Sequence, residues 1–131
     1  MLTLPEEEQR LLAIVRRDPR YAIQAYDFVR DSVTYACHVV YATGTHVRGQ
    51  ELLEAIRRLA LERYGALTRD VFESWGVTRT EDFGEIVFRL VEEGILAKTE
   101  DDSMDDFRDG FRFEEAFRNA DYWQELIGES A

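Results

Sequence analysis

The chain has 131 residues, of which 45% are hydrophobic and 12% aromatic, and its net charge is −11. This composition predicts one globular domain, residues 1–131, rather than a disordered segment. The lone cysteine, Cys37, excludes an intrachain disulfide. The chain lacks an apolar run of about 18 residues and a basic-then-apolar start, so we expect no membrane span and no secretory signal. We therefore expect a cytoplasmic protein.

The first part of the chain, residues 4–41, predicts two amphipathic helices. The first ends near Arg17. Asp18 is expected to cap the second helix, with Pro19 at its first helical position. Apolar residues then recur at helical spacing to the end of this part. Residues 33–41 also alternate as a strand would, so a strand remains the alternative to the favoured helix there.

The second part, residues 48–113, has the element order of a winged helix-turn-helix. We therefore expect a mainly α fold: a helical domain with a winged-helix-like second half and one small β-hairpin. Thr78 and Glu81 form a capping-box pattern at the start of the helix expected at 80–93. The expected elements are helices at 48–64, 67–75 and 80–93, strands at 95–99 and 111–113, and a C-terminal helix at 114–127.

The predicted helix 80–93 has an apolar stripe and an acidic face. The stripe is expected to be buried. Glu81, Glu85 and Glu92 lie off it, which predicts an outward face that tolerates charge reversal. Phe88 also lies off the stripe, and is either core from a second side or an exposed anchor for a partner. The stripe consists of Phe83, Ile86, Val87, Leu90 and Val91.

The charge of this region argues against nucleic acid as a partner. Residues 79–131 contain 6 basic and 16 acidic residues. A helix that reads DNA gains most of its affinity by neutralising phosphates with lysine and arginine. An acidic surface instead favours a basic protein partner. Glu81, Glu85, Phe88 and Glu92 are therefore the candidate protein-interaction residues.

Patterns that would indicate catalysis, a cofactor or a metal are weak. His38 and His46 are eight positions apart, and Cys37 points in a different direction from its neighbour on a helix, so no zinc site is expected. We find no glycine-rich phosphate loop and no nucleophile elbow. We thus predict no catalytic residue, cofactor or metal. The acidic loop 100–109 fails the EF-hand pattern; an irregular cation site involving Asp101, Ser103 and Asp105 stays open.

Four stretches of the chain resemble a family of short bacterial proteins described only as conserved and hypothetical. The resemblance spans residues 21–117, and it implies no activity, ligand or catalytic residue. The four stretches are residues 46–53, 72–77, 80–88 and 98–103.

These observations favour a non-enzymatic, acidic protein-interaction module. We expect a protein partner with a basic surface, no nucleic acid and no membrane, and leave homo-oligomer formation open. One alternative is an accessory subunit of an enzyme complex. The other is a DNA-binding transcription regulator of winged-helix type, which would use an arginine surface formed by Arg48, Arg57, Arg58, Arg63 and Arg69.

Overall fold

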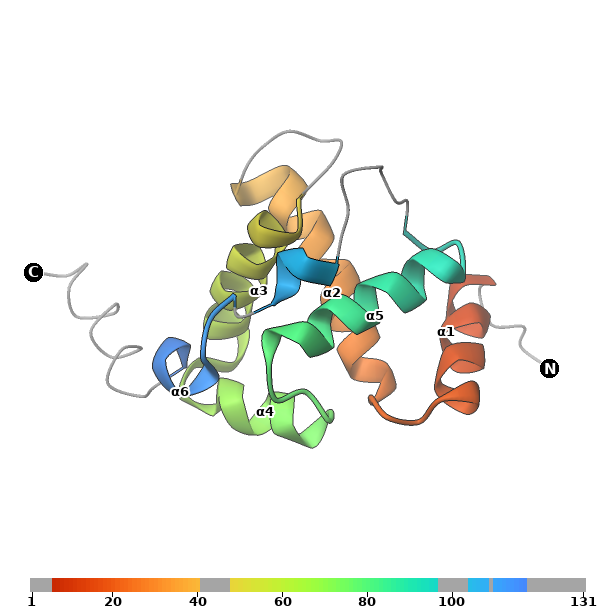
Figure 1. Cartoon of the computed structure of the whole chain (residues 1–131), viewed down its shortest axis with the longest axis horizontal. Coiled ribbons are helices and arrows are strands. Elements are labelled where there is room, and N and C mark those ends of the chain that lie inside the picture. The colour runs from red at the N-terminus through yellow and green to blue at the C-terminus, as the bar shows by residue number, and fades with distance from the viewer. Residues whose placement is uncertain (1–5, 41–47, 97–103, 109, 118–131) are drawn as a thin grey trace, which may run out of the picture.

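A computed structural model describes residues 6–40, 48–96, 104–108 and 110–117, and it confirms a mainly helical protein (Figure 1). Each long helix follows an apolar stripe in the sequence. The elements are α1 (Glu6–Arg17), α2 (Ile23–Tyr35), the π-helix η1 (Ala36–Val40), α3 (Gly49–Tyr64), the 3-10 helix η2 (Gly65–Leu67), α4 (Thr68–Ser74), α5 (Thr80–Glu92), the 3-10 helix η3 (Met104–Phe107) and α6 (Phe113–Ala116).

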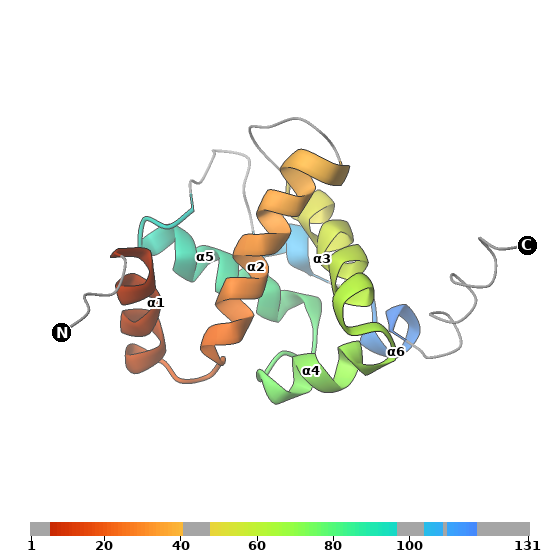
Figure 2. The ribbon, with the colours of Figure 1, turned by 180° about the vertical axis from the view of Figure 1, so that it is seen from behind.

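Helix α2 is the centre of the arrangement. It packs against α3, α5 and α1, and the two opposite views show α1 and α3 on either side of it, with α5 across its front in Figure 1 (Figures 1 and 2). Aromatic rings fill much of the space between the helices, and Phe72, which is fully buried, lies within 5.7 Å of five other ring centroids. Those five rings belong to Phe28, Trp75, Phe83, Phe113 and Phe117.

Two predictions about the helices are confirmed. Residues 33–40 are helical rather than extended, first in α2 and then in η1. On α5, the predicted apolar stripe faces the core: Phe83, Ile86 and Leu90 are fully buried, and Val87 is half-buried against them. Val91, at the edge of the same stripe, is half-buried.

The predicted start of the second helix is wrong. Asp18 does not cap it, because α2 begins only at Ile23. The Asp18 carboxylate instead accepts a hydrogen bond from the backbone N–H of Arg20 at 3.0 Å, as in an Asx turn. The N–H of Ala22 donates to the carbonyl of Trp75 at 3.1 Å. These bonds hold the connection as a turn against the end of α4.

The winged-helix-like half and its β-hairpin are not supported. Within the described residues no strand forms. After α5, Gly94 takes a φ of +74°, and the N–H groups of Ile95 and Leu96 both donate to the carbonyl of Leu90, at 2.9 and 3.3 Å. These amides close the helix end and are not free for a ladder. The rest of the predicted first strand, residues 97–99, lies outside the described residues.

The place of the predicted second strand is taken by a segment that we call the strap, residues 104–108 and 110–113. It contacts α3 and α5, and the side chain of its own residue Phe107 is buried between it and these helices. A Cβ on Gly84 of α5 would lie 2.9 Å from Phe107 Cβ, so glycine allows this close approach. The Thr80 hydroxyl donates to the Phe107 carbonyl at 2.6 Å and accepts from the Gly110 N–H at 3.1 Å. With its backbone fixed by α5, the strap has no strand partner.

At the C-terminal end, the predicted helix 114–127 is only partly covered by the structure. α6 occupies its first residues, and residues 118–131 lie outside the described part. None of the helices in the described ranges has the length and apolar character needed to cross a membrane.

Candidate functional site

The four predicted interaction residues lie on α5 but do not form one free surface. Glu92 is exposed and Glu81 is half-buried. Phe88 is half-buried and packs against the core, which fits the interpretation of core from a second side. Glu85 is tied into the protein: its carboxylate accepts Arg20 Nη1 at 2.6 Å and lies 2.9 Å from the Tyr21 hydroxyl. The expectation that Glu85 faces outward without a structural role is therefore wrong.

Glu85 belongs to a polar network between α5 and the turn before α2, centred on Asp82. Asp82 is 1% exposed. Its Oδ1 accepts the Tyr21 hydroxyl at 2.6 Å and Arg20 Nη2 at 3.2 Å. Its Oδ2 accepts the backbone N–H groups of Thr78 at 2.9 Å and Arg79 at 3.3 Å. Every side of this buried carboxylate is thus met by a donor, as a buried charge requires.

Asp82 also corrects the predicted cap of α5. The helix begins at Thr80, so Asp82 is its third residue. A carboxylate at this position can reach back to the amides before the helix, and it favours the positive end of the helix dipole. The Thr78–Glu81 capping box therefore gives way to Asp82, which serves both the helix end and the contact with Arg20 and Tyr21.

A second arginine extends the network. Arg89 Nη2 donates to Asp18 Oδ2 at 2.6 Å, and Nη1 donates to the Tyr26 hydroxyl at 3.1 Å. Burial opposes the charge of this guanidinium, but the bond to Tyr26 and the charge of Asp18 outweigh it and raise the pKa of Arg89. The guanidinium carbons of Arg20 and Arg89 lie 5.0 and 5.2 Å from the centre of the Tyr21 ring.

The groups of this network bind one another and hold the turn before α2 against α5. Burial, together with hydrogen bonds to Asp82 and Glu85, raises the pKa of Tyr21 far above its ordinary value, so its hydroxyl keeps its proton. Both carboxylates are held by Arg20. Sequence reasoning missed this cluster because its members come from positions about 60 apart; an aspartate at the third position of a helix was the available signal.

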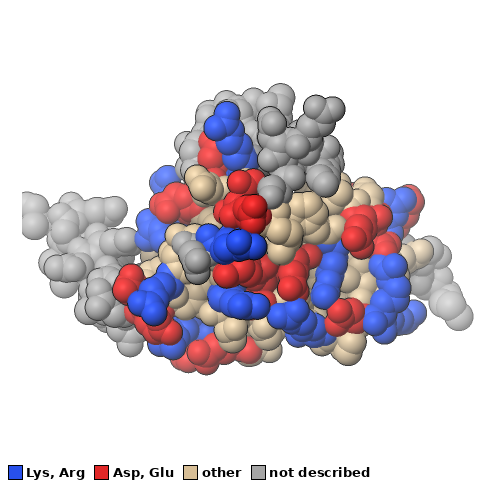
Figure 3. Space-filling view, viewed as in Figure 1, with Lys and Arg blue, Asp and Glu red and all other residues tan. Residues whose placement is uncertain are grey.

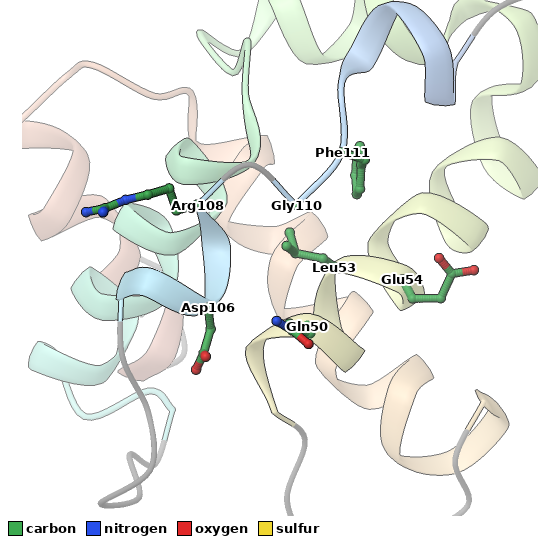
Figure 4. Close-up of a pocket in the computed structure, with 7 residues that line it drawn as sticks. All are labelled: Gln50, Leu53, Glu54, Asp106, Arg108, Gly110 and Phe111. Atoms are coloured by element: carbon green, nitrogen blue, oxygen red, sulfur yellow. The ribbon is translucent and has the colours of Figure 1, made fainter.

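An open pocket lies elsewhere, between the start of α3 and the strap. It has a volume of about 270 Å³. In Figure 4, the side chains of Leu53 and Phe111 lie on its apolar side, and Gln50 lies between the carboxylates of Glu54 and Asp106. Arg108 borders the pocket, but its guanidinium points away from the other side chains. Apolar, amide and acidic groups therefore meet at one hollow of the surface.

Only some of the candidate metal ligands lie in the described residues, and these do not come together. In the described part of the chain, no group of three histidine, cysteine, aspartate or glutamate side chains is placed to hold an ion. Cys37 is buried and His38 is exposed. His46 lies outside the described residues, as do Asp101 and Ser103 of the possible cation site. Asp105 of that site lies on η3 and pairs with Arg108 at 3.2 Å.

Three of the five arginines that the DNA-binding alternative would use already pair with carboxylates of the protein. Arg57 pairs with Glu54 at 2.9 Å, Arg63 with Asp31 at 3.0 Å, and Arg69 with Glu73 at 3.5 Å. Arg48 and Arg58 are exposed. The space-filling view shows the same mixture on the face with α5 and the strap, where acidic and basic groups alternate (Figure 3).

Comparisons with protein-family models, with curated proteins and with solved structures found no match to this chain. The resemblance to short conserved bacterial proteins therefore stays a prediction.

Proposed function

We propose that this protein is a non-enzymatic interaction module that binds a protein partner with a basic surface. The observation that supports the proposal most is the pairing of its arginines. Within the described residues most arginines hold a carboxylate, while the chain as a whole keeps a net charge of −11. The paired arginines are Arg10, Arg17, Arg20, Arg30, Arg57, Arg63, Arg69, Arg89 and Arg108.

Pairing matters because phosphate binding needs arginines that are free to release counterions from the nucleic acid. A guanidinium that already holds a carboxylate presents little net positive charge to a phosphate. The acids left in excess instead attract a basic surface and speed its approach at low salt. Within the described residues no strand forms where the wing was expected, and three of the five arginines of the DNA-binding alternative hold carboxylates, so we do not carry that alternative further.

We expect the partner to approach the face formed by the strap and the outer side of α5, which lie together towards the viewer in Figure 1. Glu81 and Glu92 are the acids of α5 that we propose for this contact: Glu92 is exposed, Glu81 is half-buried and lies 3.2 Å from the Thr80 hydroxyl, and the other two acids of α5, Asp82 and Glu85, are held by Arg20. The binding face is therefore narrower than the acidic helix suggested by the sequence alone.

The test uses the full chain as bait in its native host, with mass spectrometry of the proteins that co-purify. Two double variants carry the same change in charge: Glu81→Lys with Glu92→Lys on the proposed face, and Glu8→Lys with Asp70→Lys on α1 and α4. We expect the first pair to lose a basic partner and the second to keep it. Equal retention of every partner by both pairs would contradict the proposal.

A duplex-binding assay at near-physiological salt completes the test. We expect no retardation of a random DNA duplex at micromolar protein, because non-specific binding depends on free cationic groups. Retardation that weakens steeply with salt would instead support the arginine surface, and would overturn the proposed partner class.

A further inference from the structure

We infer that the pocket between α3 and the strap receives a long basic side chain, arginine or lysine, from the partner. This inference rests on the proposed function and assigns one contact within it. It follows from three properties of the pocket: the chemistry of its walls, the balance of charge around it, and the way in which the strap is fixed to α3.

The walls match the two ends of a basic side chain. Phe111 is half-buried and supplies the apolar surface at the opening, while Leu53, which is 3% exposed, forms the floor behind it. Arginine and lysine lay their methylene stems along such surfaces while the charged end reaches polar groups. Glu54 and Asp106 supply carboxylates beside this surface, and Gln50 supplies an amide oxygen (Figure 4).

The balance of charge favours a cation over an anion. Arg108 is the basic residue of the pocket's lining, and it pairs with Asp105 at 3.2 Å. Glu54 also holds Arg57 at 2.9 Å, so Asp106 is the carboxylate whose loss should matter most. The nearby start of α3 would attract an anion, but Glu51 already accepts the Arg48 N–H there at 3.0 Å.

The pocket is held in shape before any partner arrives. A Cβ on Gly49, the first residue of α3, would lie 2.5 Å from Asp106 Cβ, and a Cβ on Gly110 would run into Leu53. The strap therefore rests directly on α3, with Phe107 and the Thr80 hydroxyl fixing it to α5. A wall fixed in this way loses little conformational entropy when a side chain enters.

The test is an NMR titration of the full chain with a short, flexible peptide that carries one arginine between glycine and serine residues. The matched probe has citrulline in place of arginine, which keeps the shape and removes the charge. We expect the arginine peptide to shift the amide signals of Gln50, Leu53 and Gly110, and the citrulline peptide to leave them in place. Asp106→Asn should weaken binding about two- to fivefold, the range of a partly exposed ion pair.

Asp70→Asn on α4 is the control variant, because Asp70 is exposed and does not line the pocket. It should bind the arginine peptide as the unchanged chain does. Equal shifts with both peptides, no shift with either peptide, or equal affinity of the Asp106→Asn and unchanged chains would each overturn the inference. If a basic partner still co-purifies in that case, the proposed function stands without this pocket; if no partner co-purifies while the pocket binds arginine, the proposed function fails alone.

Discussion

The turn before α2 and the strap both fasten a connecting segment to α5, but they do so by opposite means. At the turn, Arg20 and Tyr21 meet the carboxylates of Asp82 and Glu85 in a network of charges. At the strap, a ring packs on a glycine, and one hydroxyl joins two backbone groups.

The difference shows which region is free to bind. In the network, each carboxylate is already matched by donors from the chain, so a ligand would have to displace internal partners. Beside the strap, Asp106 and Gln50 border an open pocket. A buried polar network is costly to leave incomplete, whereas a half-open pocket can exchange water for a partner. We therefore attribute stability to the first region, and to the second the recognition that we propose.

The largest effect should come from Asp82→Ala, which removes the centre of the network. The amides of Thr78 and Arg79 would lose their acceptor inside the protein, and the Tyr21 hydroxyl would keep only the Glu85 carboxylate. We expect the free energy of unfolding to fall by about 3 kcal/mol in urea denaturation, because unsatisfied buried groups retain their desolvation cost. Asp82→Asn keeps one acceptor oxygen and should recover part of the loss. A change below about 0.5 kcal/mol would show that the network does not stabilise the fold.

Gly84→Ala tests the strap in the same assay. Its new Cβ would meet Phe107, and overpacking of this kind costs about 1–3 kcal/mol. Phe107→Ala keeps Cβ but removes the ring carbons that would lie 2.9 and 3.0 Å from the new atom, so the double variant should lose less than the sum of the two single losses. Additive losses would mean that the ring does not limit the size of residue 84.

The alkaline limit of stability should depend on Tyr21. Its pKa is raised in the folded protein, so above the unfolded value of about 10 the unfolded state binds fewer protons than the folded state. Stability from this group is complete below that pH and falls as the pH rises further, by at most about 1.4 kcal/mol per pH unit for one proton. Tyr21→Phe should show a shallower fall between pH 10 and 12. Equal slopes for the two proteins would contradict the raised pKa.

The smallest effect, and the sharpest contrast, should come from two glutamates of the same helix. Glu85→Lys places a cation beside Arg20 and should cost about 1 kcal/mol. Glu92→Lys changes an exposed side chain and should stay within about 0.5 kcal/mol. If both variants unfold at the same urea concentration, Glu85 contributes no more to the free energy of unfolding than an exposed glutamate does.

The sequence predicted what depends on local spacing and missed what depends on distant partners. The buried stripe of α5 follows from its helical period, because Phe83, Ile86 and Leu90 recur on one side. The predicted hairpin is not supported, because Gly94 followed by Ile95 and Leu96 also suits a helix end that folds back on Leu90. That closure is made by local backbone bonds, so the same short pattern fits both a closed helix end and the start of a wing.

The site was less predictable for the same reason. Glu81, Glu85 and Glu92 look alike when they are judged by their distance from the stripe, yet Glu85 meets an arginine that is 65 positions away. The pocket joins the start of α3 to a strap that comes after α5. No spacing rule within one helix predicts either juxtaposition.

The position of the strap also has a consequence for the order in which the protein folds. During synthesis, α1 to α5 are complete before the residues of the strap emerge. Until Phe107 reaches Gly84, the side of Phe83 and Leu53 that the strap covers remains open to other chains. Closure of the strap over α5 is therefore a long-range step, because Phe107 and Gly110 meet residues 23 and 30 positions earlier in the chain.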